Sequence, residues 1–268
     1  MDYYVYTSSS LETPASIARK FSITEGQLRA ANPDWKHRVF VDLAQGEEVT
    51  MPVGIENSPW FWIYYDSMSA RSDNYFHRQT VYPRGWFPRL PNFGSPSSPL
   101  SALLTKLGNP TYTIKAPGTY HSPIVFTNNW DDANVSTVFI RQLKGVPFFS
   151  EGNTQRSSGS IKFYTKAHQA LKNLFNAWED DGLISKILTF EGSFNPRVIK
   201  SGSNPSNHSF GTAFDINGSW NGEAKPPAGI GQKGCLLELV PRANELGFYW
   251  GGFYKGNIDG MHFEYAKL

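Results

Sequence analysis

The chain contains 268 residues, of which 40% are hydrophobic and 15% aromatic, which is enough for two separate hydrophobic cores. A formal net charge of +2 and a pI near 8.5 mildly favour approach to anionic surfaces but are too small to suggest a nucleic-acid-binding protein. A single cysteine, Cys235, excludes an intramolecular disulfide framework, and its apolar neighbours in the sequence predict a buried thiol. We expect no membrane span, because no apolar run is long enough to cross a bilayer. The N-terminus lacks a basic region followed by an apolar stretch, so we expect synthesis in the cytoplasm without a signal peptide.

Residues 1–54 predict a small unit with the element order strand, helix, helix, strand. Residues 3–5 and 47–51 have the composition of strands. Thr13 directly precedes a proline and is placed to cap a first helix. Thr24 stands three residues before a glutamine, which is the capping-box spacing for a second helix.

Residues 55–110 have the composition of a connecting region that is rich in aromatic residues, proline and serine. The aromatic run at 60–65 is either a strand of the following domain or a surface for an assembly partner, and we favour the strand. The segment 94–99 predicts a connecting loop.

Residues 111–268 predict an α+β domain in which an antiparallel sheet is flanked by helices. Apolar residues at helical spacing indicate a helix of about four turns with Thr165 as its N-cap. A second helix closes at Gly247, and Pro241 delays its start or kinks it. Three segments have the pattern of strands: residues 186–190, residues 213–216 and the segment around His262.

The segment from Ser206 to Asp215 carries the first candidate metal ligands. Residues 213–216 predict a strand in which Asp215 faces opposite to its two apolar neighbours, so that one face can pack while the other coordinates. Gly211 lies between His208 and this strand, where a residue without a Cβ lets the backbone bend. We therefore expect His208 and Asp215 to lie close together.

A second segment, Asp259 to Glu264, supplies another imidazole and two more carboxylates. His262 and Glu264 alternate with apolar residues and would point the same way from a strand. Asp259 is followed by glycine, and this turn chemistry can redirect its carboxylate toward the same site.

Two imidazoles and one carboxylate are what a catalytic Zn²⁺ site with an open position for water requires. We take His208, Asp215 and His262 as the ligands and Asp259 as the general base. Glu264 is either a rival base or a group that holds His262 in its tautomer. The other histidines are expected to be surface or packing residues: His37, His77, His121 and His168.

The spacing Ser206-x-His208-x6-Asp215, followed by Asp259-x-x-His262, resembles the zinc D-alanyl-D-alanine carboxypeptidase and L-alanyl-D-glutamate endopeptidase family (peptidase M15-like). Members of that family act on peptidoglycan stem peptides and include phage endolysins. Further similar segments are residues 135–143, 188–192, 195–197 and 247–252.

The resemblance implies roles for individual residues. His208, Asp215 and His262 match the zinc ligands and Asp259 the catalytic acid-base. Arg197 matches an arginine that stabilises the oxyanion formed at the attacked carbonyl. Ser206 matches a hydroxyl residue that can bind the substrate's carboxylate or orient the ligand loop.

Residues 16–21, 28–33 and 46–52 resemble a LysM module, a fold that binds N-acetylglucosamine-containing glycans such as peptidoglycan. The segment Ser10 to Thr13 departs from that family, which usually has Gly-Asp-Thr before the first helix. Sugar binding and a purely structural or docking role therefore both remain open for residues 1–54.

Together, these patterns predict a zinc peptidoglycan stem-peptide hydrolase of phage type, with cleavage between L-Ala and D-Glu favoured by the resemblance and D-alanyl-D-alanine carboxypeptidase activity as the alternative. We expect it to act in the periplasm or cell wall after release through a holin-type lesion or injection. Peptidoglycan is the expected partner, together with components of a phage tail or injection apparatus. A second interpretation is a non-catalytic, zinc-stabilised structural or binding component of a phage-like particle.

Overall fold

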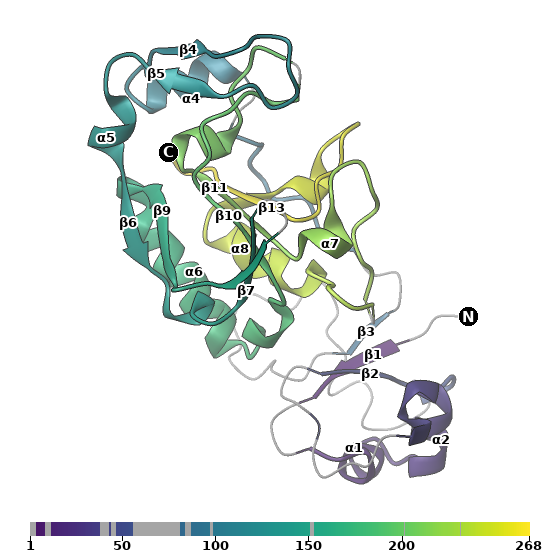
Figure 1. Ribbon diagram of the computed structural model, residues 1–268. Coiled ribbons are helices and arrows are strands. Elements are labelled where there is room, and N and C mark those ends of the chain that lie inside the picture. Colours follow the sequence, from purple (N-terminus) through teal and green to yellow (C-terminus); the bar gives the residue numbers. More distant parts are fainter. Residues whose placement is uncertain are drawn as a thin grey trace.

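The computed structural model describes residues 4–8, 12–37, 43, 47–55, 81–83, 87–96, 99–150, 153–200, 202–230 and 232–268 (Figure 1). The aromatic run expected at 60–65 lies outside the described residues. Among those described, no helix is both long and apolar enough to span a bilayer.

The N-terminal unit begins with β1 (Tyr4–Thr7), α1 (Pro14–Lys20), α2 (Glu25–Ala31), the short 3₁₀ helix η1 (Pro33–His37) and β2 (Glu48–Thr50). Both helices start at capping boxes, in which Thr13 pairs with Ser16 and Thr24 pairs with Gln27. The predicted caps are therefore present. Tyr6, Ile17, Phe21 and Leu28 belong to a small hydrophobic core of this unit.

A third strand, β3 (Val81–Pro83), completes the N-terminal sheet. It pairs antiparallel with β1 on the side opposite β2, so that the strand order is β2-β1-β3. Its three residues lie far from the other two strands in sequence.

The C-terminal part is built on a six-stranded sheet in the order β12-β13-β11-β10-β7-β8. Four pairings in this sheet are antiparallel, whereas β10 runs parallel to β7. The strands are β7 (Pro147–Ser150), β8 (Asn153–Arg156), β10 (Phe190–Gly192), β11 (Ala213–Ile216), β12 (Phe248–Trp250) and β13 (His262–Tyr265). The strand predicted over residues 186–190 begins only at Phe190, because the 3₁₀ helix η5 (Ile184–Lys186) occupies the start of this segment.

Two helices, α6 (His168–Asp180) and α8 (Val240–Glu245), pack beside the sheet (Figure 1). Trp178 of α6 lies edge-on to Phe214 of β11 and Phe263 of β13, with ring centroids 6.2 and 5.6 Å away. Because side chains alternate along a strand, burying these two phenylalanines turns their polar neighbours to the opposite face.

Both helices predicted for the C-terminal part, α6 and α8, are present, but the N-terminus of α6 differs from the prediction. Thr165 is not the N-cap of α6, since the 3₁₀ helix η4 (Thr165–Ala167) precedes it and the Thr165 hydroxyl hydrogen-bonds Ser136 instead, at 2.8 Å. Pro241 lies in the first turn of α8, where backbone N–H groups have no acceptor within the helix, so the proline removes no helical hydrogen bond. Gly247 follows with φ +87°, a left-handed conformation that favours glycine.

The remaining elements surround this sheet. Two further antiparallel pairs are formed by β4 (Tyr112–Ile114) with β5 (Ile124–Phe126) and by β6 (Val135–Phe139) with β9 (Ser160–Tyr164). The short helices are α4 (Leu100–Lys106), α5 (Trp130–Asn134), α7 (Gly218–Asn221), η3 (Arg141–Leu143), η6 (Asn207–Phe210), η7 (Leu237–Leu239) and η8 (Gly251–Phe253).

A buried ionic contact joins the N-terminal unit to the C-terminal part. Lys186 of η5, only 7% exposed, places its Nζ 2.7 Å from Oε1 of Glu48 on β2 and also pairs with Glu238 of η7. Burial lowers the pKa of Lys186, but the charge of Glu238, and that of Glu48 where Glu48 is ionised, outweigh that effect and raise it. Cys235 is buried nearby, as expected, and its burial raises the pKa of its thiol.

Candidate metal centre and its cleft

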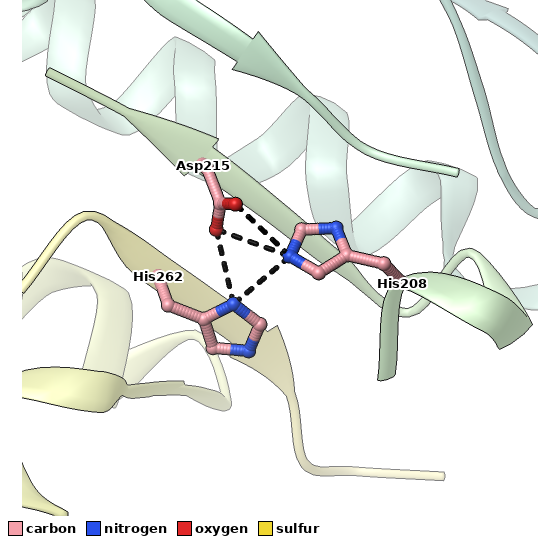
Figure 2. Close-up of side chains that lie close together, drawn as sticks. All are labelled: His208, Asp215 and His262. Carbon is pink, nitrogen blue, oxygen red and sulfur yellow. Dashed lines mark hydrogen bonds and ion pairs between the residues drawn. The ribbon is translucent and has the colours of Figure 1, made fainter. Parts of the chain in front are cut away.

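His208, Asp215 and His262 converge at one point (Figure 2). Nε2 of His208 lies 3.1 Å from Oδ1 of Asp215 and 3.1 Å from Nδ1 of His262. Nδ1 of His262 lies 3.0 Å from the same carboxylate oxygen. The three side chains are 4–7% exposed, so they are nearly withdrawn from solvent.

The local backbone explains this convergence. Asp215 and His262 are direct neighbours across the antiparallel pair β11 and β13 and point to the face opposite Phe214 and Phe263. His208 reaches them from η6, which ends at Gly211 with φ +63°. A Cβ at Gly211 would lie 3.0 Å from the backbone nitrogen of Tyr164, so the turn requires glycine.

The donor atoms fit a single zinc ion. Ligands at 2.0–2.1 Å in tetrahedral geometry are about 3.3 Å apart, close to the separations found between these nitrogen and oxygen atoms. Nδ1 of His208 lies 2.7 Å from the carbonyl oxygen of Ser193, to which its N–H donates, so that Nε2 presents its lone pair to the cluster.

The electrostatics of the cluster also favour a cation. Burial raises the pKa of Asp215, but His208 and His262 outweigh it and hold that pKa well below its usual range. Burial lowers the pKa of His262, but the hydrogen bonds to Asp215 and Glu264 outweigh it and raise that pKa well above the ordinary value. Both shifts favour a positive charge beside the Asp215 carboxylate, which either a proton or a metal ion supplies.

Glu264 lies on the side of the His262 ring that faces away from the three-residue cluster. Its Oε2 is 3.4 Å from Nε2 of His262, the ring nitrogen that faces away from the cluster, and it also accepts from the Asn207 amide. Burial raises the pKa of the Tyr254 hydroxyl well above its ordinary value, and the charge of Glu264 adds to this shift. Glu264 is fully buried and does not line the cleft, so its position favours the supporting role over that of a base.

Asp259 lies in the cleft beside the cluster. It stands at the turn before β13, where its carbonyl accepts from the His262 N–H at 3.2 Å. Its Oδ1 is buried, and no hydrogen-bond partner for it occurs in the described part of the chain. Burial raises the pKa of Asp259 to about 6, with repulsion from Asp215 adding to the shift and His262 opposing it. A carboxyl with such a pKa can both accept and return a proton near neutral pH.

Ser206 and Arg197 both line the same cleft. Ser206 caps η6 and its N–H donates to the Arg197 carbonyl at 2.9 Å. The Arg197 backbone is fixed further by two hydrogen bonds with the Ser209 hydroxyl, at 2.9 and 2.7 Å. Within the residues that the structure describes, the Arg197 guanidinium has no hydrogen-bond or ion-pair partner, so it is available to a bound anion.

The cleft is a cavity of about 410 Å³ that also includes residues without a sequence signal. His121, expected at the surface or in packing, lines it instead with a left-handed backbone, φ +55°. Burial lowers the pKa of His121, and the Arg197 charge lowers it further. Glu223, Tyr254 and Asn257 line the cavity too. No motif surrounds these residues in the sequence, because they meet through the packing of separate loops.

Residues 200–265 match a protein-family model described as D-alanyl-D-alanine carboxypeptidase, a peptidase M15 family. The matched segment contains Ser206, His208, Asp215, Asp259 and His262, whereas Arg197 lies before it. This match supports a peptidase of that general kind in the C-terminal part. Neither the curated proteins nor the solved structures include a match to this chain.

Proposed function

We propose that this protein is a zinc-dependent hydrolase of peptidoglycan stem peptides. The observation that carries the proposal is the arrangement of three donor atoms 3.0–3.1 Å apart beside the buried, unpartnered Asp259 oxygen, within the described residues. The match of residues 200–265 to a peptidase family supports it.

His208, Asp215 and His262 would hold the ion. Zinc with three protein ligands lowers the pKa of water toward about 7 and polarises a substrate carbonyl. Asp259 takes a proton from the attacking water and returns it to the leaving amine, tasks that suit its raised pKa. Arg197 lines the same cavity, and its charge stabilises the negative charge that develops on the attacked carbonyl oxygen.

Two bonds of the stem peptide are candidates. The resemblance of residues 1–54 to a glycan-binding module favours the L-alanyl-D-glutamate bond, as in lysin-like enzymes. The description of the matched family favours the D-alanyl-D-alanine bond. Specificity depends on the walls of the cavity rather than on the ligands, so the metal centre itself serves both reactions.

The N-terminal unit is proposed to act as a LysM-like module that binds glycan or docks the protein. Its capped helices and paired strands support that fold, while the segment from Ser10 to Thr13 departs from the usual sugar-lining loop. Delivery to peptidoglycan through a holin-type lesion, or by injection with phage-tail components, belongs to the same proposal.

A digest of purified sacculi, paired with metal analysis of the protein, tests the proposed function. We expect one zinc per chain and new muropeptides in mass spectra, with either a new amino terminus at D-Glu or a lost D-Ala. Bound zinc and bound sacculi without any new peptide product would instead identify a non-catalytic, zinc-stabilised component of a particle.

A further inference from the structure

The chain segment that carries Arg197 lies between two others. On one side, Pro123 and Arg197 are antiparallel neighbours. On the other side, Val198 pairs antiparallel with Pro205, which stands three residues before the ligand His208. Three segments therefore lie side by side, and the one in the middle carries Arg197.

His121 belongs to the segment that contains Pro123, and its backbone is fixed there. The His121 N–H donates to the Lys200 carbonyl at 2.7 Å, and the Ser122 hydroxyl closes the preceding turn by donating to the Ala116 carbonyl at 2.8 Å. His121 has φ +55°, a left-handed conformation that a residue other than glycine keeps only where its surroundings impose it. Such conformations cluster at functional sites.

The imidazole of His121 is open to a ligand in the cavity. His121 lines the cavity together with Arg197 and Ile199. Its ring packs on the Tyr120 ring, with centroids 4.1 Å apart, and neither ring nitrogen has a hydrogen-bond partner among the described residues. The ring therefore offers one N–H donor and one acceptor to a bound molecule.

The charge state of His121 suits a position beside Arg197. Burial lowers the pKa of His121, and the Arg197 charge lowers it further, so the ring is neutral near neutral pH. A neutral imidazole adds a donor next to the guanidinium without adding a second positive charge. Because the two side chains come from adjacent segments and line the same cavity, their N–H groups can converge on one oxygen anion.

The acids of the cavity leave room for an anion. Oε1 of Glu223 is 3.3 Å from Nζ of Lys200 and also accepts from the Asn257 amide, so the Glu223 charge is already paired. Lys255 lines the cavity as well as Arg197. Within the described residues that line the cavity, these two cations therefore face one acid outside an ion pair, Asp259.

We propose that His121 and Arg197 form an anion-binding pair, in which the imidazole N–H and the guanidinium donate together to one negatively charged oxygen of the bound peptide. This inference rests on the proposed function, under which two kinds of oxygen qualify. One is the oxyanion: the water oxygen bonds to the carbonyl carbon, and the π electron pair moves to the carbonyl oxygen. That pair returns when the C–N bond breaks and Asp259 protonates the leaving amine. The other is a free carboxylate of the stem peptide.

Two substitutions of His121 test the pair on the peptide L-Ala-D-Glu-L-Lys-D-Ala-D-Ala. His121→Phe keeps a ring against Tyr120 but removes both nitrogens, whereas His121→Gln keeps an N–H donor. We expect kcat/KM to fall about 10–100-fold in His121→Phe, as for the loss of a hydrogen bond to a charged group, and less than about fivefold in His121→Gln. Tyr120→Phe, which removes only a hydroxyl from the same turn, is the matched control and should behave as the wild type.

A second peptide, with both carboxyl groups amidated, identifies the anion. A lower kcat of His121→Phe on both peptides indicates the oxyanion, and a higher KM on the free peptide alone indicates a carboxylate. A higher KM on both peptides overturns the pair, because neither anion is then involved. Unchanged kcat and KM in folded, zinc-loaded His121→Phe, or an equal loss in His121→Phe and His121→Gln, overturns it as well.

Calorimetry separates this inference from the proposed function. Its probes are the two peptides and phosphinate analogues of the two candidate bonds, which carry a tetrahedral anion in place of the scissile amide. Suppose that the wild type cleaves neither peptide. If His121→Phe then binds a phosphinate, or the free but not the amidated peptide, at least about tenfold more weakly than the wild type and His121→Gln do, the pair stands and the proposed function is lost. Equal binding overturns the pair. Cleavage by the wild type, with kinetics and binding unchanged in His121→Phe, overturns the pair and leaves the proposed function intact.

Discussion

Asp215 and His262 are directly opposite each other on β11 and β13, and their Oδ1 and Nδ1 atoms are 3.0 Å apart. Side chains of opposed residues in an antiparallel pair leave the sheet on the same face and close together. The register of two strands thus places two of the three candidate ligands, and only His208 must be brought in by a separate turn.

Replacing Asp215 by asparagine should remove zinc binding while preserving the size of the side chain. A neutral amide is a weaker ligand than a carboxylate, so we expect affinity for zinc to fall by more than about 100-fold, beyond the loss typical of supporting residues. Competition with a chelator measures the zinc affinity of the variant and of the wild type. Asp181→Asn, which alters a surface pair with Arg242, is the control, and equal affinities in both variants would contradict the ligand assignment.

Replacing Asp259 by alanine should reduce cleavage severely while zinc binding and the fold are kept. The carboxyl binds no other group among the described residues through its buried oxygen, so its removal breaks no hydrogen bond of that atom. Proton transfer by a positioned side chain contributes about 10²–10⁴-fold, and kcat/KM on a stem peptide should fall by that factor. Turnover close to that of the wild type would remove Asp259 from the role of base.

The conversion of Glu264 to glutamine tests its supporting role behind His262. Its carboxylate accepts from Asn207 and lies 3.4 Å from the outer nitrogen of His262. Loss of such a partner typically reduces metal affinity by about 10–100-fold, so we expect a smaller effect than for Asp215→Asn. If zinc affinity were unchanged and only kcat fell, Glu264 would instead act in proton transfer.

The conversion of Gly211 to alanine should weaken both the fold and the metal site. The residue has φ +63°, and an added Cβ would meet the Tyr164 backbone, which Gly211 also holds through a hydrogen bond of 2.8 Å. We expect the free energy of unfolding to fall by about 2–4 kcal/mol in denaturant titrations. Gly108→Ala has a similar φ, +80°, but open space around the new Cβ, so its cost should stay near about 1 kcal/mol with unchanged zinc affinity.

Glu48 should make the stability of the protein depend on pH. Burial, together with repulsion from Glu238, raises the pKa of Glu48 to about 8 against the opposing Lys186 charge. The folded state therefore binds a proton that the unfolded chain has already released above its ordinary pKa of 4.5. The stability that this proton contributes is complete below pH 4.5 and is lost as the pH rises to about 8.

Glu48→Gln removes this dependence. Between pH 5 and 8, the free energy of unfolding should decline less steeply in the variant than in the wild type, by an amount on the order of 2 kcal/mol. Parallel urea titrations across this range measure the difference. Two curves that run parallel would show that Glu48 is ionised throughout.

The features that could be predicted from the sequence are those determined by residues close to one another in the chain. The helix caps at Thr13 and Thr24, the strand around Asp215 and the turn at Gly211 all follow from side-chain chemistry within a few positions. The proximity of His208 and Asp215 was predictable for the same reason, because only the turn at Gly211 lies between His208 and the strand that contains Asp215.

Features set by distant pairings were not predictable. The addition of β3 to the N-terminal sheet and the parallel contact of β10 with β7 depend on strands that are remote in sequence. His121 was expected at the surface or in packing, yet it lines the cleft because its loop is attached to Lys200. Neither its spacing nor its neighbours in the sequence carry this information.

The ammonium of Lys186 is buried between an acid on β2 and another on η7, two segments almost 200 positions apart along the chain. Excising residues 1–54 would remove one hydrogen-bond acceptor from this buried ammonium, a change that destabilises the truncated product. Chimeras that join another N-terminal module to the C-terminal part therefore require, at the place of Glu48, a side chain that accepts a hydrogen bond from the Lys186 ammonium.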